Sequence, residues 1–360
     1  MRCQFGGAAG ATKGGAMKAK TVLFDEVGAP EVLRIEEVEL GAPGPGEVRV
    51  RVEAMGLNRS EALFRAGAYY YAPDLPASRI GAEAAGVIEE VGPEVEGFAA
   101  GDPVTVLATA AGAMSAYGVY AERVNVPAST LFRRHPSVDA VTGAATWLSY
   151  LTAYGALVEI GGLRPGDTVL ITAASSSVGI AAIQVANLVG AVPIAVTRTV
   201  AKREQLLKAG AARVITLDED DLVALMDALT DGAGARVVFD AVGGPEVSRL
   251  AGTVARDGML IVYGSLDGRP TPLPPHWPLA VYGFALPAVL DHDDRKRRAT
   301  AFIESGLRSG ALSPLIDRTF PLHAIADAHR HLEGNGQVGK IVVTVGLGDG
   351  LREARRATSA

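Results

Sequence analysis

A short turn of small residues is the first feature of this sequence that could do chemistry. Residues 169–172 form an apolar run, the segment AASSSVG (173–179) interrupts it, and an apolar helical pattern follows. A strand that enters a helix through a tight turn leaves unpaired N–H groups and the positive end of the helix dipole at its tip. That arrangement suits a phosphate group. The predicted phosphate-binding residues are Ser175, Ser176, Ser177, Val178 and Gly179.

The serines of this turn admit two interpretations. The segment departs from the G-x-G-x-x-G pattern of dinucleotide sites and keeps only its last glycine, Gly179, where a helix packs closely on a strand. The three hydroxyl groups could donate hydrogen bonds to phosphate oxygens. Alternatively, the serines are simply small enough to let a phosphate approach.

The end of the next strand-like run (193–197) bears on which nucleotide binds. An acidic residue about 20 positions beyond the turn would bind a ribose 2′-hydroxyl, but no acid stands there. A phosphorylated ribose instead favours cationic donors, since Arg presents a planar fork. The residues at this point are Thr197, Arg198, Thr199 and Lys202. The pattern favours NADPH over NADH, with an ordinary charged helix start as the alternative.

Composition narrows the possible partners. The chain has 360 residues, 48% of them apolar, and a net charge of −6. This charge disfavours nucleic acid or an anionic membrane as the main partner, and no apolar run is long enough for a membrane helix. Cys3 is the single cysteine, so neither an internal disulfide nor a multi-thiolate zinc site can form. These features fit a cytoplasmic protein.

The chain changes rhythm along its length. From residue 17 to about 134, short alternating runs separated by Gly and Pro predict an antiparallel β-domain. From about 138 to 284, strands and helices alternate, which predicts a parallel sheet covered on both faces. Helices are expected in that region near 178–189, 201–209, 220–230 and 245–255, with a final strand at 258–264. Beyond it we expect a helix over 293–309, a strand over 318–322, a helix over 323–332 and a strand over 340–345.

Seven separated motifs, in this order, resemble the medium-chain dehydrogenase/reductase superfamily, and within it the zinc-free quinone oxidoreductase branch. They are GLNRSEALFRAG (56–67), GAEAAGVIEEVG (81–92), GDPV (101–104), LTAYGAL (151–157), the AASSSVG turn, FDAVGG (239–244) and QVGKIVVTV (337–345). The resemblance implies an α/β protein in which a GroES-like, mainly antiparallel β catalytic domain joins a Rossmann-type, doubly wound parallel-sheet domain. It also implies a cleft between the domains and a homodimer.

On this basis the chain divides into five parts. Residues 1–16 are expected to be a disordered leader, and residues 347–360 a flexible tail. The GroES-like domain takes residues 17–137 and resumes at 287–346. The NADP-binding Rossmann domain lies between these segments, at 138–286.

Metal-free chemistry is expected from two substituted positions. Zinc-dependent relatives carry a Cys in the LNRSEA-type segment and a His in a GHE motif, where this chain has Asn58 and Ala82. The histidines form no ligand pattern, because His329 and His331 diverge when two apart on a helix. Glu83 of the same triplet is expected to be a structural carboxylate, paired with an Arg or with backbone donors.

Hydride transfer to an electrophilic acceptor needs mainly orientation beside the nicotinamide and stabilisation of charge on the acceptor oxygen. The resemblance implies that Asn58, at the family's LN position, supplies an amide donor and also contacts the cofactor. It implies a phenol donor at Tyr69, although Tyr70 or Tyr71 could take that place in a longer loop. The alternative is that these tyrosines form a substrate wall.

Further cofactor contacts are expected from the resemblance and from the ends of later strands, where ligands bind in open α/β sheets. Those matched to the family are Thr152, Gly283, Phe284 and Lys340. Those at strand ends are Val242, Gly243, Gly264 and Ser265. Turn geometry or core packing is the alternative for each of them.

Two remaining segments have simpler interpretations. The Pro-rich stretch 270–284, with Trp277 and Tyr282, could form a dimer surface or a lid over the cleft. The run DHDDRKRR (291–298) pairs opposite charges at helical spacing and predicts a solvated helix face.

Together these features predict a metal-free, NADPH-dependent reductase of the quinone oxidoreductase type that passes hydride to a quinone or an activated enone. The nearest alternative is an alkenal or enoyl-thioester double-bond reductase, for which Arg65, Arg79 and Arg123 could contribute to a basic groove. A third is an NADPH-binding protein without catalytic activity.

Overall fold

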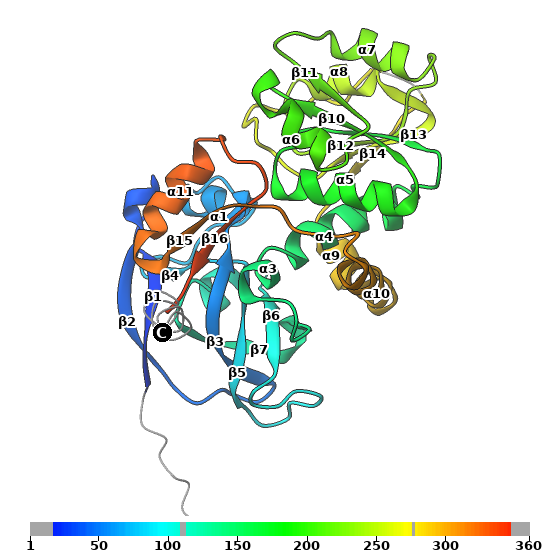
Figure 1. The fold of residues 1–360 in the computed structure, drawn as a ribbon. Helices are drawn as coiled ribbons and strands as arrows, with labels where there is room; N and C mark the ends of the chain where they lie inside the picture. Colours follow the sequence, from blue (N-terminus) through cyan, green and yellow to red (C-terminus); the bar gives the residue numbers. More distant parts are fainter. Residues whose placement is uncertain (1–16, 109–112, 276–277, 347–360) are drawn as a thin grey trace, which may run out of the picture.

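The computed structural model describes residues 17–108, 113–275 and 278–346, which form two lobes (Figure 1). The first lobe holds the first third of the chain together with its last strands, and the second holds the middle. The expected leader, the expected tail and Trp277 lie outside the described residues. No helix in the described ranges is both long and apolar enough to span a bilayer.

The first lobe is a mainly antiparallel β-structure. Its larger sheet has the order β15-β16-β3-β5-β6-β8, with β7 also paired to β3, and only β15 and β16 are parallel. Its strands are β3 (Glu47–Gly56), β5 (Glu83–Val91), β6 (Pro103–Leu107), β7 (Arg123–Pro127), β8 (Leu131–Arg133), β15 (Ile316–Pro321) and β16 (Lys340–Thr344). A smaller sheet joins β2 (Arg34–Leu40), β1 (Met17–Phe24) and β4 (Ser78–Arg79). Along β3, Val48, Val50 and Val52 are buried at a spacing of two, which places them on one face of the sheet.

The second lobe is built on a six-stranded parallel sheet with the order β11-β10-β9-β12-β13-β14. Its strands are β9 (Thr168–Ile171), β10 (Val192–Thr197), β11 (Arg213–Thr216), β12 (Ala235–Asp240), β13 (Val254–Val262) and β14 (Ala280–Gly283). Its helices include α5 (Ser177–Val189), α6 (Arg203–Lys208), α7 (Leu222–Leu229) and α8 (Val247–Ala251). β9 has β10 on one side and β12 on the other, so the strand order changes direction at β9. The carboxyl edge beside that reversal is where open α/β sheets bind ligands.

The predicted fold class is confirmed, with two local corrections in the second lobe. The helix expected over 245–255 ends at Ala251, because β13 already begins at Val254. The Pro-rich stretch 270–284 contains an additional strand, β14, which pairs in parallel with β13. β14 is short and mostly exposed at the sheet edge, so it lacks the apolar pattern that revealed the other strands.

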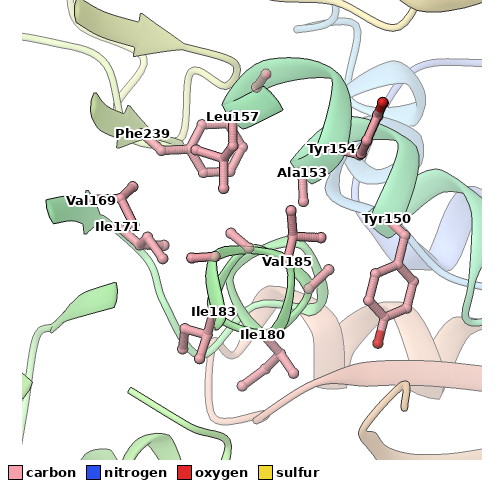
Figure 2. Packing of buried hydrophobic residues seen from close by; sticks show 14 of the residues in the cluster. Tyr150, Ala153, Tyr154, Leu157, Val169, Ile171, Ile180, Ile183, Val185 and Phe239 are labelled. Carbon is pink, nitrogen blue, oxygen red and sulfur yellow. The ribbon is translucent and has the colours of Figure 1, made fainter. Parts of the chain in front are cut away.

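Helices α9 (Pro287–Leu290) and α10 (Asp293–Ser309) pack on the second lobe. Their buried residues Val289, Ala299 and Ile303 belong to the same apolar cluster as α4 (Trp147–Tyr154) and α5. Figure 2 shows how side chains from α4, α5, β9 and β12 meet in this cluster. The domain boundaries remain a proposal, and we now place α9 and α10 with the second lobe rather than with the GroES-like domain.

The end of the chain connects the lobes. Helix α11 (Ile325–Glu333) packs beside α1 (Arg59–Arg65), and β16 then joins the first sheet against β3. Between them, the N–H of Gly339 donates to the carbonyl of Ser175 at 2.8 Å. The loop 334–339 is thereby fixed against the serine-rich turn of the second lobe. The other short helices are α2 (Ala113–Tyr117) and α3 (Ala140–Gly143).

Candidate active site

A cleft of about 1350 Å³ is lined by residues of both lobes. Most of the residues predicted from sequence line it, although they come from widely separated segments. They are Asn58, Tyr69, Thr152, Ser175, Ser176, Ser177, Val178, Thr197, Arg198, Thr199, Lys202, Val242, Gly264, Ser265 and Phe284. Four others are absent from the lining of this cleft, namely Gly179, Gly243, Gly283 and Lys340.

The serines of the turn have different partners. Ser176 is the N-cap of α5, where its Oγ accepts a hydrogen bond from the N–H of Gly179 at 3.0 Å. Ser175 Oγ instead accepts from Lys202 Nζ at 3.1 Å. A Cβ on Gly179 would lie 2.5 Å from the carbonyl oxygen of Ala174, so this glycine permits close helix–strand packing. The turn therefore combines a capped helix N-terminus with a hydroxyl linked to a cation.

Lys202 is held at the end of the cleft by three acceptors. Besides Ser175, its Nζ donates to the carbonyl oxygens of Asn335 and Gln337, both at 2.9 Å. Partial burial lowers the pKa of Lys202, and the nearby Arg198 guanidinium lowers it further. Arg198 follows β10 and is exposed at the cleft wall. No acid stands at the end of β10, so this corner carries positive charge.

Arg59, which the sequence reasoning did not single out, contributes a third cation to the cleft. It is the first residue of α1, and its Nη2 donates to the carbonyl of Leu332 at 2.9 Å and to Asn335 Oδ1 at 2.5 Å. Burial lowers the pKa of Arg59, and so does the proximity of Arg198. The only sequence signal was its position directly after Asn58.

The loop after β12 is fixed by a buried carboxylate. Asp240 accepts hydrogen bonds from Thr172 Oγ1 at 2.6 Å, the N–H of Val242 at 3.1 Å and the N–H of Gly243 at 2.8 Å. Burial raises the pKa of Asp240 in spite of these donors. Gly243 has a φ of 67°, which favours glycine, and it shapes this loop behind the cleft lining.

Asn58 and Lys340 occupy different surroundings from those expected. The Lys340 side chain is 1% exposed, and its Nζ donates to Asn58 Oδ1 at 2.6 Å and to Glu83 Oε2 at 2.8 Å. Both N–H groups of the Asn58 amide are also engaged, with the carbonyl of Gly56 and with Glu61 Oε1. The ammonium of Lys340 thus supports the cleft floor and does not face the cleft.

Two buried carboxylates flank this network. Glu83 accepts from Lys340 and from the N–H of Leu148 at 2.9 Å, so it has the structural surroundings that were expected, with Lys in place of Arg. Glu61, which the sequence reasoning missed, accepts from the N–H of Asn58 at 2.6 Å and from that of Ala82 at 3.0 Å. Burial raises the pKa of Glu61 to about 7, although Lys340 acts to lower it.

The three consecutive tyrosines form an aromatic wall of the cleft. The rings of Tyr69 and Tyr71 are half-buried with centroids 5.0 Å apart, whereas Tyr70 is 65% exposed. Phe64 extends the wall inward, with its centroid 5.4 Å from that of Tyr71. Burial raises the pKa of Tyr69, and the neighbouring Tyr70 adds to the effect. The phenol of Tyr69 is therefore protonated near neutral pH.

The remaining predicted residues have mainly structural contacts. Thr152 Oγ1 donates to the carbonyl of Leu148 within its own helix, at 2.7 Å. A Cβ on Gly264 would lie 2.5 Å from the carbonyl oxygen of Ala241, so the cleft wall is tightly packed there. Phe284 is 5% exposed, and Gly283 lies on the exposed edge strand with open space around it.

The second lobe has a parallel sheet with a capped helix and a cationic corner at its carboxyl edge, and a cleft lies between it and the β-lobe. These features together are those of a dinucleotide-dependent oxidoreductase. The family model "Zinc-binding dehydrogenase" matches residues 177–288, and "Alcohol dehydrogenase GroES-like domain" matches residues 44–136. The chain belongs to the medium-chain dehydrogenase/reductase superfamily, in its quinone oxidoreductase branch, and is an NAD(P)H-dependent oxidoreductase.

Two relatives and one solved structure illustrate the relationship. The chain is 30% identical to a 2-haloacrylate reductase of Burkholderia sp, over 88% of this chain and 96% of that protein. It is 34% identical to quinone oxidoreductase 1 of Escherichia coli (strain K12), over 70% and 75% of the two chains. The solved structure of Escherichia coli quinone oxidoreductase complexed with NADPH superposes with a TM-score of 0.83 at 29% identity, covering 91% of this chain and all of that one.

Within residues 17–108, 113–275 and 278–346, no three His, Cys, Asp or Glu side chains come together as metal ligands would. Metal-independent activity stays a prediction, which rests on the substitutions at Asn58 and Ala82.

Proposed function

We propose that the protein is a metal-independent reductase that uses NADPH to reduce a quinone or an activated enone. The observation that carries this proposal is the cationic corner of the cleft. Arg198 and Lys202 stand there in place of the acid that would bind a free ribose hydroxyl, and Ser175 lies beside them. The Escherichia coli relative, whose structure was solved with NADPH, supports the same choice.

The residues of the cleft fit NADPH by the chemistry of their donors. The N-terminus of α5, capped by Ser176, presents backbone N–H groups suited to a pyrophosphate. Arg198 is suited to a 2′-phosphate, because charged donors form stronger hydrogen bonds with phosphate than neutral donors do. The three N–H groups of Lys202 already have acceptors, so Lys202 adds positive charge beside the phosphate. Gly264, which follows β13, has no room for a Cβ beside the carbonyl oxygen of Ala241. The cleft wall therefore carries no side chain at this point.

The protein itself has to position the acceptor and support its reduction. When bound, NADPH would supply a hydride, which a quinone takes up together with one proton to give the hydroquinone. The Tyr69–Tyr71 wall offers an apolar surface on which a flat acceptor can stack, and it limits access of water. In this proposal the Tyr69 hydroxyl donates a hydrogen bond to the acceptor oxygen.

Asn58 has a revised role in the proposal. Its amide would have to give up the 3.2 Å bond to the Gly56 carbonyl before it could donate to an acceptor. We therefore propose that Asn58 shapes the cleft floor beside the reacting groups. The same surroundings support metal independence, because the Lys340 ammonium already lies 2.6 Å from Asn58 Oδ1 and would repel a second cation there.

A second acceptor class is favoured by one comparison. The Burkholderia relative is named for reduction of a haloacrylate, which contains an activated carbon–carbon double bond. For such an acceptor the hydride adds to the β-carbon and a proton to the α-carbon. A large thioester carrier receives less support, because Arg65, Arg79 and Arg123 are absent from the lining of the described cleft. Arg65 is instead buried against Glu333.

We also propose a homodimer joined at the edge of the second sheet. β14 is the last strand on that side, and the structure gives it no second strand partner within the described ranges. Val281 on this strand is 42% exposed. An uncovered edge strand with an apolar side chain is a common site for pairing with another chain.

The test of the proposed function is oxidation of NADPH with a panel of acceptors, run with and without a chelator. The panel contains quinones, enals, a haloacrylate and enoyl thioesters. We expect turnover with quinones or with activated alkenes, and no loss of rate on chelation. Binding of NADPH without turnover on any acceptor would contradict both enzymatic proposals and leave the non-catalytic alternative. Loss of activity with the chelator would contradict metal independence.

A further inference from the structure

Arg59 reaches the cationic corner from the opposite lobe. It begins α1 in the first lobe, whereas Arg198 and Lys202 follow β10 in the second. Its Nη2 uses both hydrogens on the carbonyl of Leu332 and on Asn335 Oδ1. The structure gives its Nε and Nη1 no hydrogen-bond partner among the described residues, and neither atom is fully enclosed. Three N–H donors of this guanidinium thus remain for a ligand.

Asn335 links two of these cations. Its side-chain oxygen accepts from Arg59, and its backbone carbonyl accepts from Lys202. The residue has a φ of 57°, and its own Nδ2 donates to the carbonyl of Glu333 at 2.8 Å, so the loop that carries it is well defined. One loop residue therefore sets the relative positions of an arginine from one lobe and a lysine from the other.

Two acids of the described residues, Glu333 and Asp317, lie near this corner, and both are shared with other donors. Arg59, Arg198 and Lys202 line the same cleft, and Arg198 lowers the pKa of the other two, as a nearby like charge does. Glu333 and Asp317 act in the opposite direction on these two residues, yet each has another partner. Glu333 pairs with Arg65 at 2.6 Å, and Asp317 accepts from His331 and from the N–H of Val338.

The other arginines of the cleft are already paired. Arg269 contacts Asp267 at 2.6 Å, and Arg249 lies near Glu246 and Asp221. An anion entering the cleft therefore meets its uncompensated positive charge where Arg59, Arg198 and Lys202 converge. A doubly charged phosphate group would relieve their mutual repulsion, whereas an uncharged hydroxyl would not.

We propose that Arg59 is a specificity-determining residue that binds the 2′-phosphate of NADPH from the first lobe, opposite Arg198 and Lys202. This inference rests on the proposed use of NADPH and adds the residue that makes the phosphate a link between the lobes. The guanidinium fork donates to two phosphate oxygens while Nη2 stays on the carbonyl of Leu332 and on Asn335 Oδ1. NADH lacks this phosphate, so Arg59 contributes little to its binding.

The test measures binding of fragments that lack the nicotinamide. Wild-type protein and Arg59→Gln are titrated calorimetrically with adenosine 2′,5′-bisphosphate and with adenosine 5′-monophosphate. We expect the wild type to prefer the bisphosphate. The substitution should weaken bisphosphate binding by about 10- to 100-fold, the loss typical of one charge-assisted contact, and leave the monophosphate within about twofold.

Two further variants separate a direct contact from a structural effect. Arg59→Lys keeps the charge and loses the fork, so it should retain part of the affinity for the bisphosphate. Arg79→Gln is the matched control, since Arg79 is a partly buried arginine of the same lobe that does not line the cleft. It should bind both fragments as the wild type does.

The fragment titrations distinguish the role of Arg59 from the proposed preference for NADPH. If the wild type binds both fragments equally, the preference for NADPH is itself wrong. If the wild type discriminates but Arg59→Gln discriminates equally well, the role of Arg59 is wrong and the preference stands. If Arg59→Gln weakens both fragments to the same degree, Arg59 only supports the loop, and the inference is again overturned.

Discussion

Lys340 and Asn58, 282 residues apart in the chain, are joined by a 2.6 Å hydrogen bond beneath the floor of the cleft. The ammonium fixes the orientation of the Asn58 amide, because a reversed amide would point its NH₂ group at Lys340 and its oxygen at the Glu61 carboxylate. Glu83 provides the second oxygen to the same ammonium. The network therefore connects the starts of α1, β5 and β16 in the first lobe.

Replacing Lys340 should destabilise the protein strongly. In Lys340→Met the buried Glu83 carboxylate loses its only cationic partner among the described residues. Breaking a buried ion pair from one side costs about 3–5 kcal/mol. Urea unfolding of the variant should show a loss of this size, while Lys18→Met, at an exposed site, should stay within about 0.5 kcal/mol of the wild type. A loss below about 1 kcal/mol for Lys340→Met would show that the pair is not buried as described.

The stability of the protein should depend on pH through Glu61. Burial raises its pKa from an ordinary 4.5 to about 7 in the folded chain. Between these values the folded protein holds a proton that the unfolded chain has released, so the free energy of unfolding falls as pH rises from about 4.5 to about 7. Glu61→Gln removes this titration and should flatten the dependence of the free energy of unfolding on pH. The variant should also be less stable overall, because the NH₂ group of Gln cannot accept from the backbone N–H groups that Glu61 binds. Chemical unfolding at a series of pH values measures both slopes, and parallel slopes would contradict the raised pKa.

Lys202 should affect NADPH and NADH differently. Lys202→Met removes a positive charge from the cationic corner and should raise the dissociation constant for NADPH about tenfold or more, with little change for NADH. Because the site is partly exposed, added salt should reduce the difference between the two cofactors in the wild type. Fluorescence titration of both reduced cofactors provides the comparison. An equal rise of the two dissociation constants would show that Lys202 acts only through its contacts with the carbonyls of Asn335 and Gln337.

A phenol donor at Tyr69 predicts a rate effect without a binding effect. Tyr69→Phe should lower kcat with a quinone about tenfold to a hundredfold, since one hydrogen bond to the developing charge is lost, while NADPH binding stays unchanged. Tyr70→Phe is the matched control, because its side chain is 65% exposed. Steady-state kinetics separates the two substitutions. Equal and small effects would support the alternative in which the tyrosines act only as a wall.

Two glycines at the second sheet differ in the space around them. A Cβ at Gly264 would meet the carbonyl oxygen of Ala241 at 2.5 Å, whereas a Cβ at Gly283 would meet nothing within 4 Å. Gly264→Ala should therefore lose about 1–3 kcal/mol of stability through overpacking, and Gly283→Ala should be close to neutral. Thermal unfolding of both variants tests this contrast. Equal stabilities would show that the packing of Gly264 after β13 is looser than described.

Local features of the site could be predicted from the sequence, whereas its long-range contacts could not. The serine-rich turn and the basic residues after β10 are short patterns whose chemistry follows from the strand and helix beside them. The contact of Lys340 with Asn58 depends on how β16 pairs with β3, and no local pattern contains that register. Arg59 was missed because its partner Asn335 lies 276 residues further along the chain, in the loop after α11. β14 was missed because a short exposed edge strand carries no burial pattern.

In the proposed function, this cleft transfers hydride from NADPH to a quinone without a metal. The most direct measurement mixes protein saturated with NADPH, in the presence of a chelator, with a simple quinone and follows the loss of reduced nicotinamide in a single turnover. We predict a rapid loss that slows when the transferable hydrogen of the nicotinamide is deuterium, and a much weaker response when NADH replaces NADPH at the same low concentration. Bound NADPH that persists in the presence of the quinone, or an equal response with NADH, would contradict the account.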